Sequence, residues 1–211
     1  MPVKQSHYEE LLATYSNHSS VVSLLKQYRP YLEMLPSMRR ANESFISLPL
    51  PVAKIQNPQI QTGAFSSASR GDLTRLPCDF AILMCDPDWK VKTGVEIFVF
   101  IHRPQEDFSE LLGRWRQTQI YLDRGYEWVM PFHYRHILSE EAEDARPLFV
   151  VFPETSERII RGLRGACLPY IVHSVSPEIE DLELSQEQSE ELESLDHWEL
   201  PTDSGTPSSE M

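Results

Sequence analysis

Cysteine is scarce in this 211-residue sequence, which contains only three. Cys78 and Cys85 lie seven residues apart in one predicted strand, so their side chains point to opposite faces, and Cys167 stands alone. These positions do not suit a disulfide framework. A reducing compartment fits this cysteine usage best.

Long hydrophobic runs are also lacking. No window approaches the roughly 20 consecutive apolar residues that a membrane-spanning helix needs. The first ten residues, MPVKQSHYEE, contain no apolar core of the kind found in secretory signal peptides. We therefore expect an intracellular protein, cytoplasmic or nuclear, with no membrane partner.

Several motifs that carry chemistry are absent too. The sequence contains no glycine-rich phosphate loop, no G-x-S-x-G nucleophile elbow and no paired C-x-x-C. His133 and His136 lie three residues apart, but no cysteine or carboxylate stands at ligand spacing from them. A zinc site is therefore not expected.

Acidic residues are abundant but concentrated at one end of the chain. The formal net charge is -13. Residues 176–211 contain 12 acidic residues and no Lys or Arg, whereas residues 1–175 hold the other 20 acidic residues and all 19 Lys and Arg. The body is thus close to neutral, and the acidic balance argues against nucleic-acid binding only for the last 36 residues.

Patterning divides the chain into three parts. In residues 1–43, apolar residues recur at helical spacing and Pro30 marks a break, which predicts an N-terminal helical cap. Residues 44–175 begin with extended segments and a predicted hairpin, and strands and helices alternate after residue 103, which indicates an α/β core with a mixed central sheet flanked by helices. Residues 176–211 are acidic and rich in Ser, Gln and Pro, so we expect a disordered tail.

Two strands and one helix of the core are the most clearly patterned elements. CDFAILMC (78–85) predicts a buried strand, and GVEIFVFIH (94–102) predicts the second strand of a hairpin. Residues 106–123 predict a helix with one apolar stripe, which Gly125 ends. Glu96 stands within the second strand, where a buried carboxylate must be paired, protonated or bound to a metal.

Asp79, Glu96, Gln117 and Tyr121 are the candidate catalytic residues. Asp79 begins the first central strand, Glu96 lies early in the second, and the other two share the helix that follows. Two strand carboxylates can hold Mg²⁺ or Mn²⁺, with Asp79 and Glu96 as ligands, and such a metal activates water. The alternatives are a turn cap at Asp79, a solvated strand end at Glu96 and ordinary helix positions for the others.

This order of elements resembles the PD-(D/E)XK nuclease superfamily, and QTQIY (117–121) resembles the Q-x-x-x-Y motif of its RecB-type branch. The resemblance covers residues 75–132 and implies a restriction-endonuclease-like core in which Asp79 and Glu96 bind the metal. Gln117 and Tyr121 would shape the site or contact DNA. Phe98 replaces the family's lysine two residues after the second carboxylate. The implied function is metal-dependent phosphodiester hydrolysis, or binding of nucleic acid by a degenerate version that does not cleave it.

Arginine supplies the candidate nucleic-acid contacts. Arg114 and Arg116 belong to the predicted helix at 106–123, and Arg158, Arg161 and Arg164 recur every three residues on a shorter one. The guanidinium fork suits phosphate, so these residues would bind DNA or RNA without reading its sequence. The alternative is a solvated helix face balanced by neighbouring acids.

The acidic tail carries a second functional hypothesis. Large apolar residues interleave with its acids, which is typical of segments that fold on a partner. The alternative function is therefore a non-enzymatic regulatory or adaptor protein that recruits a protein partner through residues 176–211. A tethered acidic tail would also compete with nucleic acid for the arginines.

Overall fold

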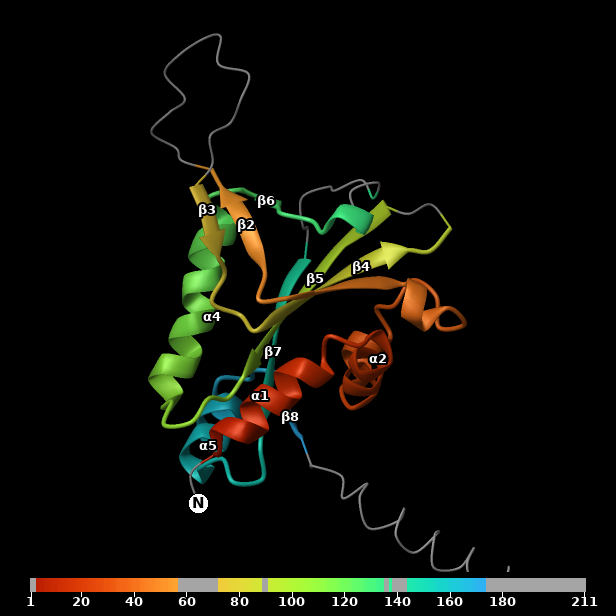
Figure 1. The fold of residues 1–211 in the computed structure, drawn as a ribbon. Helices are drawn as coiled ribbons and strands as arrows, with labels where there is room; N and C mark the ends of the chain where they lie inside the picture. The colour runs from red at the N-terminus through yellow and green to blue at the C-terminus, as the bar shows by residue number, and fades with distance from the viewer. Residues whose placement is uncertain (1–2, 57–71, 89–90, 135–136, 138–143, 174–211) are drawn as a thin grey trace, which may run out of the picture. The chain divides into compact units, whose positions relative to one another are not determined.

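Five strands form a mixed sheet at the centre of the protein (Figure 1). Their order is β1-β4-β5-β7-β8, in which β4 is antiparallel to both neighbours and β7 is parallel to both of its own. The strand bounds are β1 Phe45–Pro49, β4 Phe80–Asp86, β5 Val91–Ile101, β7 Asp144–Val151 and β8 Tyr170–Val172. The predicted α/β class with a mixed central sheet is confirmed.

The computed structural model describes residues 3–56, 72–88, 91–134, 137 and 144–173. The predicted tail lies outside these residues, so its order and its partners stay predictions. In the described part of the chain, no helix combines the length and the hydrophobicity needed to cross a membrane.

Three N-terminal helices, as predicted, pack on one face of the sheet (Figure 1). Their bounds are α1 Gln5–Thr14, α2 His18–Lys26 and α3 Arg29–Leu32, and a 3₁₀ helix, η1, follows at Ala41–Glu43. Pro30 lies in the first turn of α3, where its missing N–H leaves no helical hydrogen bond unmade. Leu11 and Leu24 join Ile97 and Val99 of β5 in one hydrophobic cluster.

The opposite face of the sheet carries a second hydrophobic cluster, which includes Phe98 and Phe100 of β5. Successive strand residues point to opposite faces, so β5 contributes to both clusters. The second face is covered by two helices and a small antiparallel sheet of order β3-β2-β6. The bounds are α4 Phe108–Asp123, α5 Glu157–Gly165, β3 Asp72–Arg75, β2 Val52–Ile55 and β6 Tyr126–Trp128.

A capping box at its start and a glycine just past its end define the two ends of helix α4. Asp107 accepts a hydrogen bond from the Glu110 backbone N–H, and the Glu110 side chain accepts one from the Asp107 N–H, which forms a capping box. Leu111 and Trp115 form its buried stripe. Gly125 has a φ of 80°, which glycine adopts without strain, and follows directly after the end of the helix.

Two helical glycines give opposite stability predictions. A Cβ at Gly113 of α4 meets no atom within 4 Å, so Gly113→Ala should raise the free energy of unfolding by about 0.5–1 kcal/mol through helix propensity. A Cβ at Gly162 of α5 lies 2.7 Å from the Phe108 ring, so Gly162→Ala should instead destabilise the protein because α4 and α5 must move apart. Urea unfolding of both variants measures the difference, and equal stabilisation by both would contradict the close α4–α5 contact.

Candidate functional site

Asp79 is fully buried just before β4, and donors from the protein occupy both of its carboxylate oxygens. Oδ1 accepts hydrogen bonds from Arg103 Nη2 at 2.8 Å and from the Tyr8 hydroxyl at 2.8 Å. Oδ2 accepts one from the Ile101 backbone N–H at 2.7 Å and pairs with Arg114 Nη2. The carboxylate therefore lies between two arginines rather than facing an open site.

Arg114 holds this cluster together from α4. Its side chain is 10% exposed and also donates to the carbonyl oxygens of Pro77 and Ile101, both at 3.0 Å. Glu106 pairs with it at 3.3 Å, and the Glu106 side chain is only 7% exposed. Two carboxylates thus balance two guanidiniums, and Arg114 has little surface left for a nucleic acid.

Two members of the cluster, Tyr8 and Arg103, have a raised pKa. Burial raises the pKa of Tyr8, and the Asp79 carboxylate raises it further, so the hydroxyl remains a neutral donor. Burial by itself lowers the pKa of Arg103, but the hydrogen bond and the charge of Asp79 outweigh that effect, and the net change is upward. The Arg103 guanidinium also lies 5.7 Å from the centre of the Tyr8 ring, within cation–π range.

Glu96 is held in a separate cluster on β5. It is 1% exposed, and Lys92 Nζ lies 2.5 Å from its Oε1. Trp128 Nε1 donates to Oε1 at 2.8 Å, and the Tyr126 hydroxyl donates to Oε2 at 2.5 Å. A buried carboxylate was expected to be paired, protonated or bound to a metal, and the structure shows Glu96 paired with Lys92.

An irregularity in β5 brings Lys92 and Glu96 together. Leu83 of β4 is opposite Glu96, and Cys85 is opposite Lys92. Two residues of β4 are therefore matched by four residues of β5 over this stretch, so β5 contains two extra residues. Gly94 lies within it with a φ of 79°, the left-handed conformation that glycine allows. The bulge therefore lets a lysine and a glutamate four residues apart meet on one strand.

Asp79 and Glu96 are not brought together. The Asp79 N–H bonds to the Val99 carbonyl, whereas Glu96 is opposite Leu83, four residues further along β4. Four strand residues span about 13 Å. Phe98 and its partner Ala81, both buried, occupy the register between the two acids. The predicted carboxylate pair is therefore not formed.

A divalent cation does not fit either carboxylate. Each already contacts arginine or lysine, whose positive charge would repel a second cation. Within the described ranges, no group of three or more His, Cys, Asp or Glu side chains is placed to hold a metal ion. The expected Mg²⁺ or Mn²⁺ ligands thus serve as internal salt-bridge partners.

The remaining predicted site residues lie on α4 and α5 and join neither charged cluster. Gln117 is exposed and Tyr121 is half-buried against the second hydrophobic cluster, and neither bonds to Asp79 or Glu96. The other four predicted residues are exposed arginines: Arg116, Arg158, Arg161 and Arg164. Tyr8, Tyr126 and Trp128 were not predicted as site residues, although they complete the two clusters from distant parts of the chain.

Comparison with protein-family models, curated proteins and solved structures finds no match to this chain. The resemblance to PD-(D/E)XK nucleases therefore stays a prediction from the order of elements and the Q-x-x-x-Y spacing.

Proposed function

We propose that the protein binds nucleic acid without cleaving it, on a degenerate restriction-endonuclease-like core of the PD-(D/E)XK type. The order of the elements is the observation that carries this proposal. The β4–β5 hairpin is followed by α4, which bears Gln117 and Tyr121, and then by β7, which is parallel to β5. The superfamily arranges its hairpin, motif helix and next strand in the same order.

The buried charges support binding over cleavage. Hydrolysis would need a metal held by free carboxylates, but Asp79 and Glu96 are neutralised by Arg103, Arg114 and Lys92. Phe98, at the position of the motif lysine, is buried and has no group that donates to water or phosphate.

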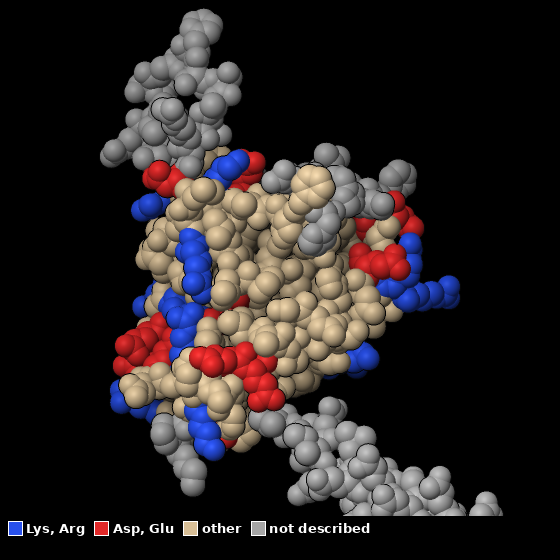
Figure 2. All heavy atoms as spheres, viewed as in Figure 1, with Lys and Arg blue, Asp and Glu red and all other residues tan. Residues whose placement is uncertain are grey.

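Exposed arginines supply the binding surface. The arginine surface is defined as Arg116, Arg158, Arg161 and Arg164. Arg116 and Arg158 have no ion pair or hydrogen bond with another described residue, Arg161 is 3.9 Å from Glu157, and Arg164 donates to the Tyr170 hydroxyl at 3.2 Å. In Figure 2, Lys and Arg side chains, interspersed with Asp and Glu, lie along the left edge, where Figure 1 shows β3 and α4.

A binding assay with paired variants tests the proposal. Full-length protein should bind 5′-hydroxyl DNA or RNA oligonucleotides in fluorescence anisotropy, with an affinity that falls steeply as salt rises. Arg116→Glu/Arg158→Glu should weaken binding by at least about tenfold, because two phosphate contacts become repulsive. Lys26→Glu/Arg39→Glu changes the net charge equally on the other side of the sheet and should bind like wild type.

Two results would contradict this function. Equal loss in both double variants would show that net charge alone governs binding. Cleavage of the oligonucleotide that requires Mn²⁺ and is lost in Glu96→Ala would show that the carboxylates act as metal ligands. The adaptor function through residues 176–211 concerns residues outside the described part of the chain and stays a prediction.

A further inference from the structure

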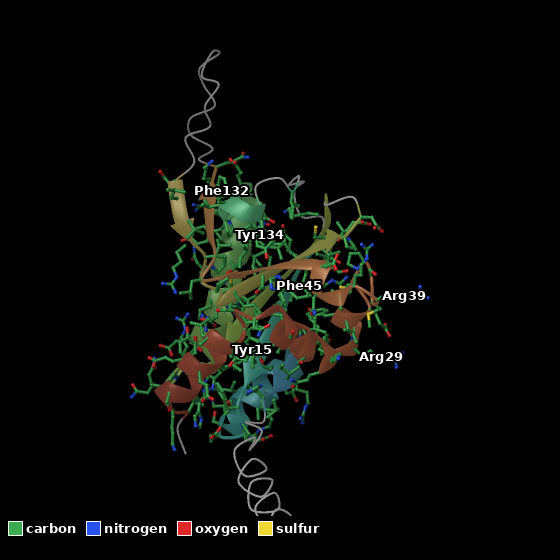
Figure 3. All side chains as sticks on the ribbon, turned by 45° about the vertical axis from the view of Figure 1, so that its right-hand side comes forward. Tyr15, Arg29, Arg39, Phe45, Phe132 and Tyr134 are labelled. Carbon is green, nitrogen blue, oxygen red and sulfur yellow. The ribbon has the colours of Figure 1, made fainter. Side chains whose placement is uncertain are left out.

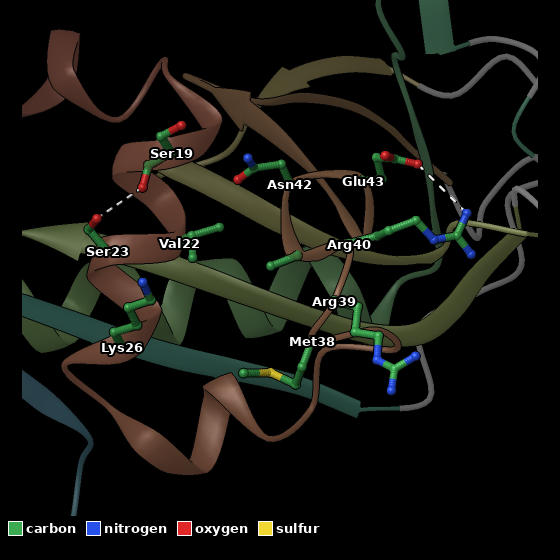
Figure 4. Close-up of a pocket in the computed structure, with 10 residues that line it drawn as sticks. Ser19, Val22, Ser23, Lys26, Met38, Arg39, Arg40, Asn42 and Glu43 are labelled. Atoms are coloured by element: carbon green, nitrogen blue, oxygen red, sulfur yellow. Dashed lines mark hydrogen bonds and ion pairs between the residues drawn. The ribbon is translucent and has the colours of Figure 1, made fainter.

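A pocket of about 440 Å³ opens between α2 and the segment that leads through η1 (Figure 4). Helix α2 carries Ser19, Val22, Ser23 and Lys26 on one side. Residues 38–43 form the other side and include Met38, Arg39 and Asn42. These elements pack on the face of the sheet opposite to α4 and α5, so the pocket is remote from the arginine surface.

Two positively charged side chains of the pocket have no ion-pair partner among the described residues. Arg40 pairs with Glu43 at 3.8 Å and with Asp88 at 2.5 Å, so the pocket's single acid already has a partner. Lys26 and Arg39 are exposed and form no ion pair or hydrogen bond with any described residue. Figure 3 shows Arg39 projecting from the edge of the helical layer, and Figure 4 shows it across the pocket from Lys26, so the two exposed side chains would turn toward each other to hold one ligand.

The neutral polar groups of the pocket can supply further donors. The Ser19 hydroxyl and the Asn42 amide have no partner among the described residues. The Ser23 hydroxyl donates a hydrogen bond to the Ser19 carbonyl oxygen at 3.0 Å, so toward a ligand the hydroxyl oxygen can act only as an acceptor. A lining with an ammonium, a guanidinium, an amide and a hydroxyl is complementary to an anion rich in acceptor oxygens.

The size of the pocket and its apolar lining indicate an organic ligand that carries an anionic group, rather than an inorganic anion alone. Ligand sites for small organic molecules have volumes of roughly 300–1,000 Å³, and this pocket falls within that range. Met38 is 57% exposed, and Val22 and Ala41 also line the pocket. A thioether is a polarisable platform for the ring of a ligand.

We propose that this pocket binds a phosphate monoester of nucleotide size. Lys26 and Arg39 hold the phosphate, Ser19 and Asn42 donate to its oxygens or to the sugar, and Met38 supports the ring. The phosphate comes either from a free nucleotide or from the 5′ end of a strand, and the chemistry of the site is the same for both. This inference does not depend on nucleic-acid binding by the arginine surface.

Isothermal titration calorimetry of the full-length protein tests the proposal with three probes: adenosine 5′-monophosphate, adenosine and inorganic phosphate. The monophosphate should bind most tightly, inorganic phosphate more weakly, and adenosine without detectable heat. Lys26→Gln/Arg39→Gln should weaken binding of the monophosphate by at least about tenfold, since both charge-assisted contacts are lost. Arg75→Gln/Arg124→Gln, which makes the same charge change at two exposed arginines outside both the pocket and the arginine surface, should bind it like wild type.

Two outcomes overturn the phosphate site: equal binding of the monophosphate by wild type and Lys26→Gln/Arg39→Gln, or equal binding of adenosine and its monophosphate. The side chains of both cations are exposed, so unchanged melting temperatures should accompany the loss of binding. Competition by a 5′-phosphorylated tetranucleotide, but not by its 5′-hydroxyl form, identifies a strand end as the source. Competition by neither identifies the free nucleotide.

Discussion

Asp79→Ala should lower the free energy of unfolding by about 3–5 kcal/mol, because it removes one side of a buried ion-pair cluster and leaves the other side uncompensated. Arg114 is 10% exposed and would retain a charge that water reaches poorly. The Tyr8 hydroxyl and the Ile101 N–H would also lose their acceptor. Urea unfolding of the full-length protein, followed by circular dichroism, measures the change.

A matched surface acid provides the control for Asp79. Glu127 pairs with Lys54 at 3.2 Å, but its side chain is 61% exposed. Glu127→Ala should therefore cost no more than about 1 kcal/mol. If Asp79→Ala were no more destabilising than Glu127→Ala, the Asp79 cluster would not be part of what holds α1 and α4 to the sheet.

Lys92→Met should be nearly as damaging, with an expected loss of about 3–5 kcal/mol, because Glu96 would remain buried without its cation. The double variant Lys92→Met/Glu96→Gln should recover about 2 kcal/mol or more of that loss. The glutamine is neutral and keeps a carbonyl oxygen for Trp128 and an amide that can donate to the Tyr126 oxygen. A double-mutant cycle from urea unfolding separates the charge effect from the hydrogen bonds.

The same cycle distinguishes a salt bridge from a metal ligand. If the double variant were as unstable as Lys92→Met alone, the buried charge of Glu96 would not be the cause of the loss. If Mn²⁺ stabilised Lys92→Met but not the double variant, the carboxylate would be able to bind metal once freed from its lysine.

Much of the fold follows from the sequence because its signals are local. The amphipathic stripe around Leu111 and Trp115 predicts α4, and Gly125 predicts its end. The apolar runs of β4 and β5 are long enough to indicate two buried strands. The small sheet was not predicted, since β2 pairs with β6 across more than 70 residues of chain.

The site was harder to predict because its geometry depends on register. Sequence order places Asp79 and Glu96 on neighbouring strands, but it does not say which residues are opposite each other. The bulge at Gly94 sets that register and also brings Lys92 to Glu96. A lysine four residues before a strand glutamate is a weak signal, because a regular strand separates such residues by about 13 Å.

Strand β5 lies in the middle of the five-stranded sheet and contributes residues to both hydrophobic clusters, so the alignment of β5 with its neighbours decides which side chains are buried on each face. A slip of one residue in β5 would exchange its two faces. Glu96 would then point into the hydrophobic cluster beneath α1 and α2, where neither Trp128 nor Tyr126 could donate to it. The buried acid thus penalises the shifted alignment and selects a single arrangement of the sheet over its nearest competitor.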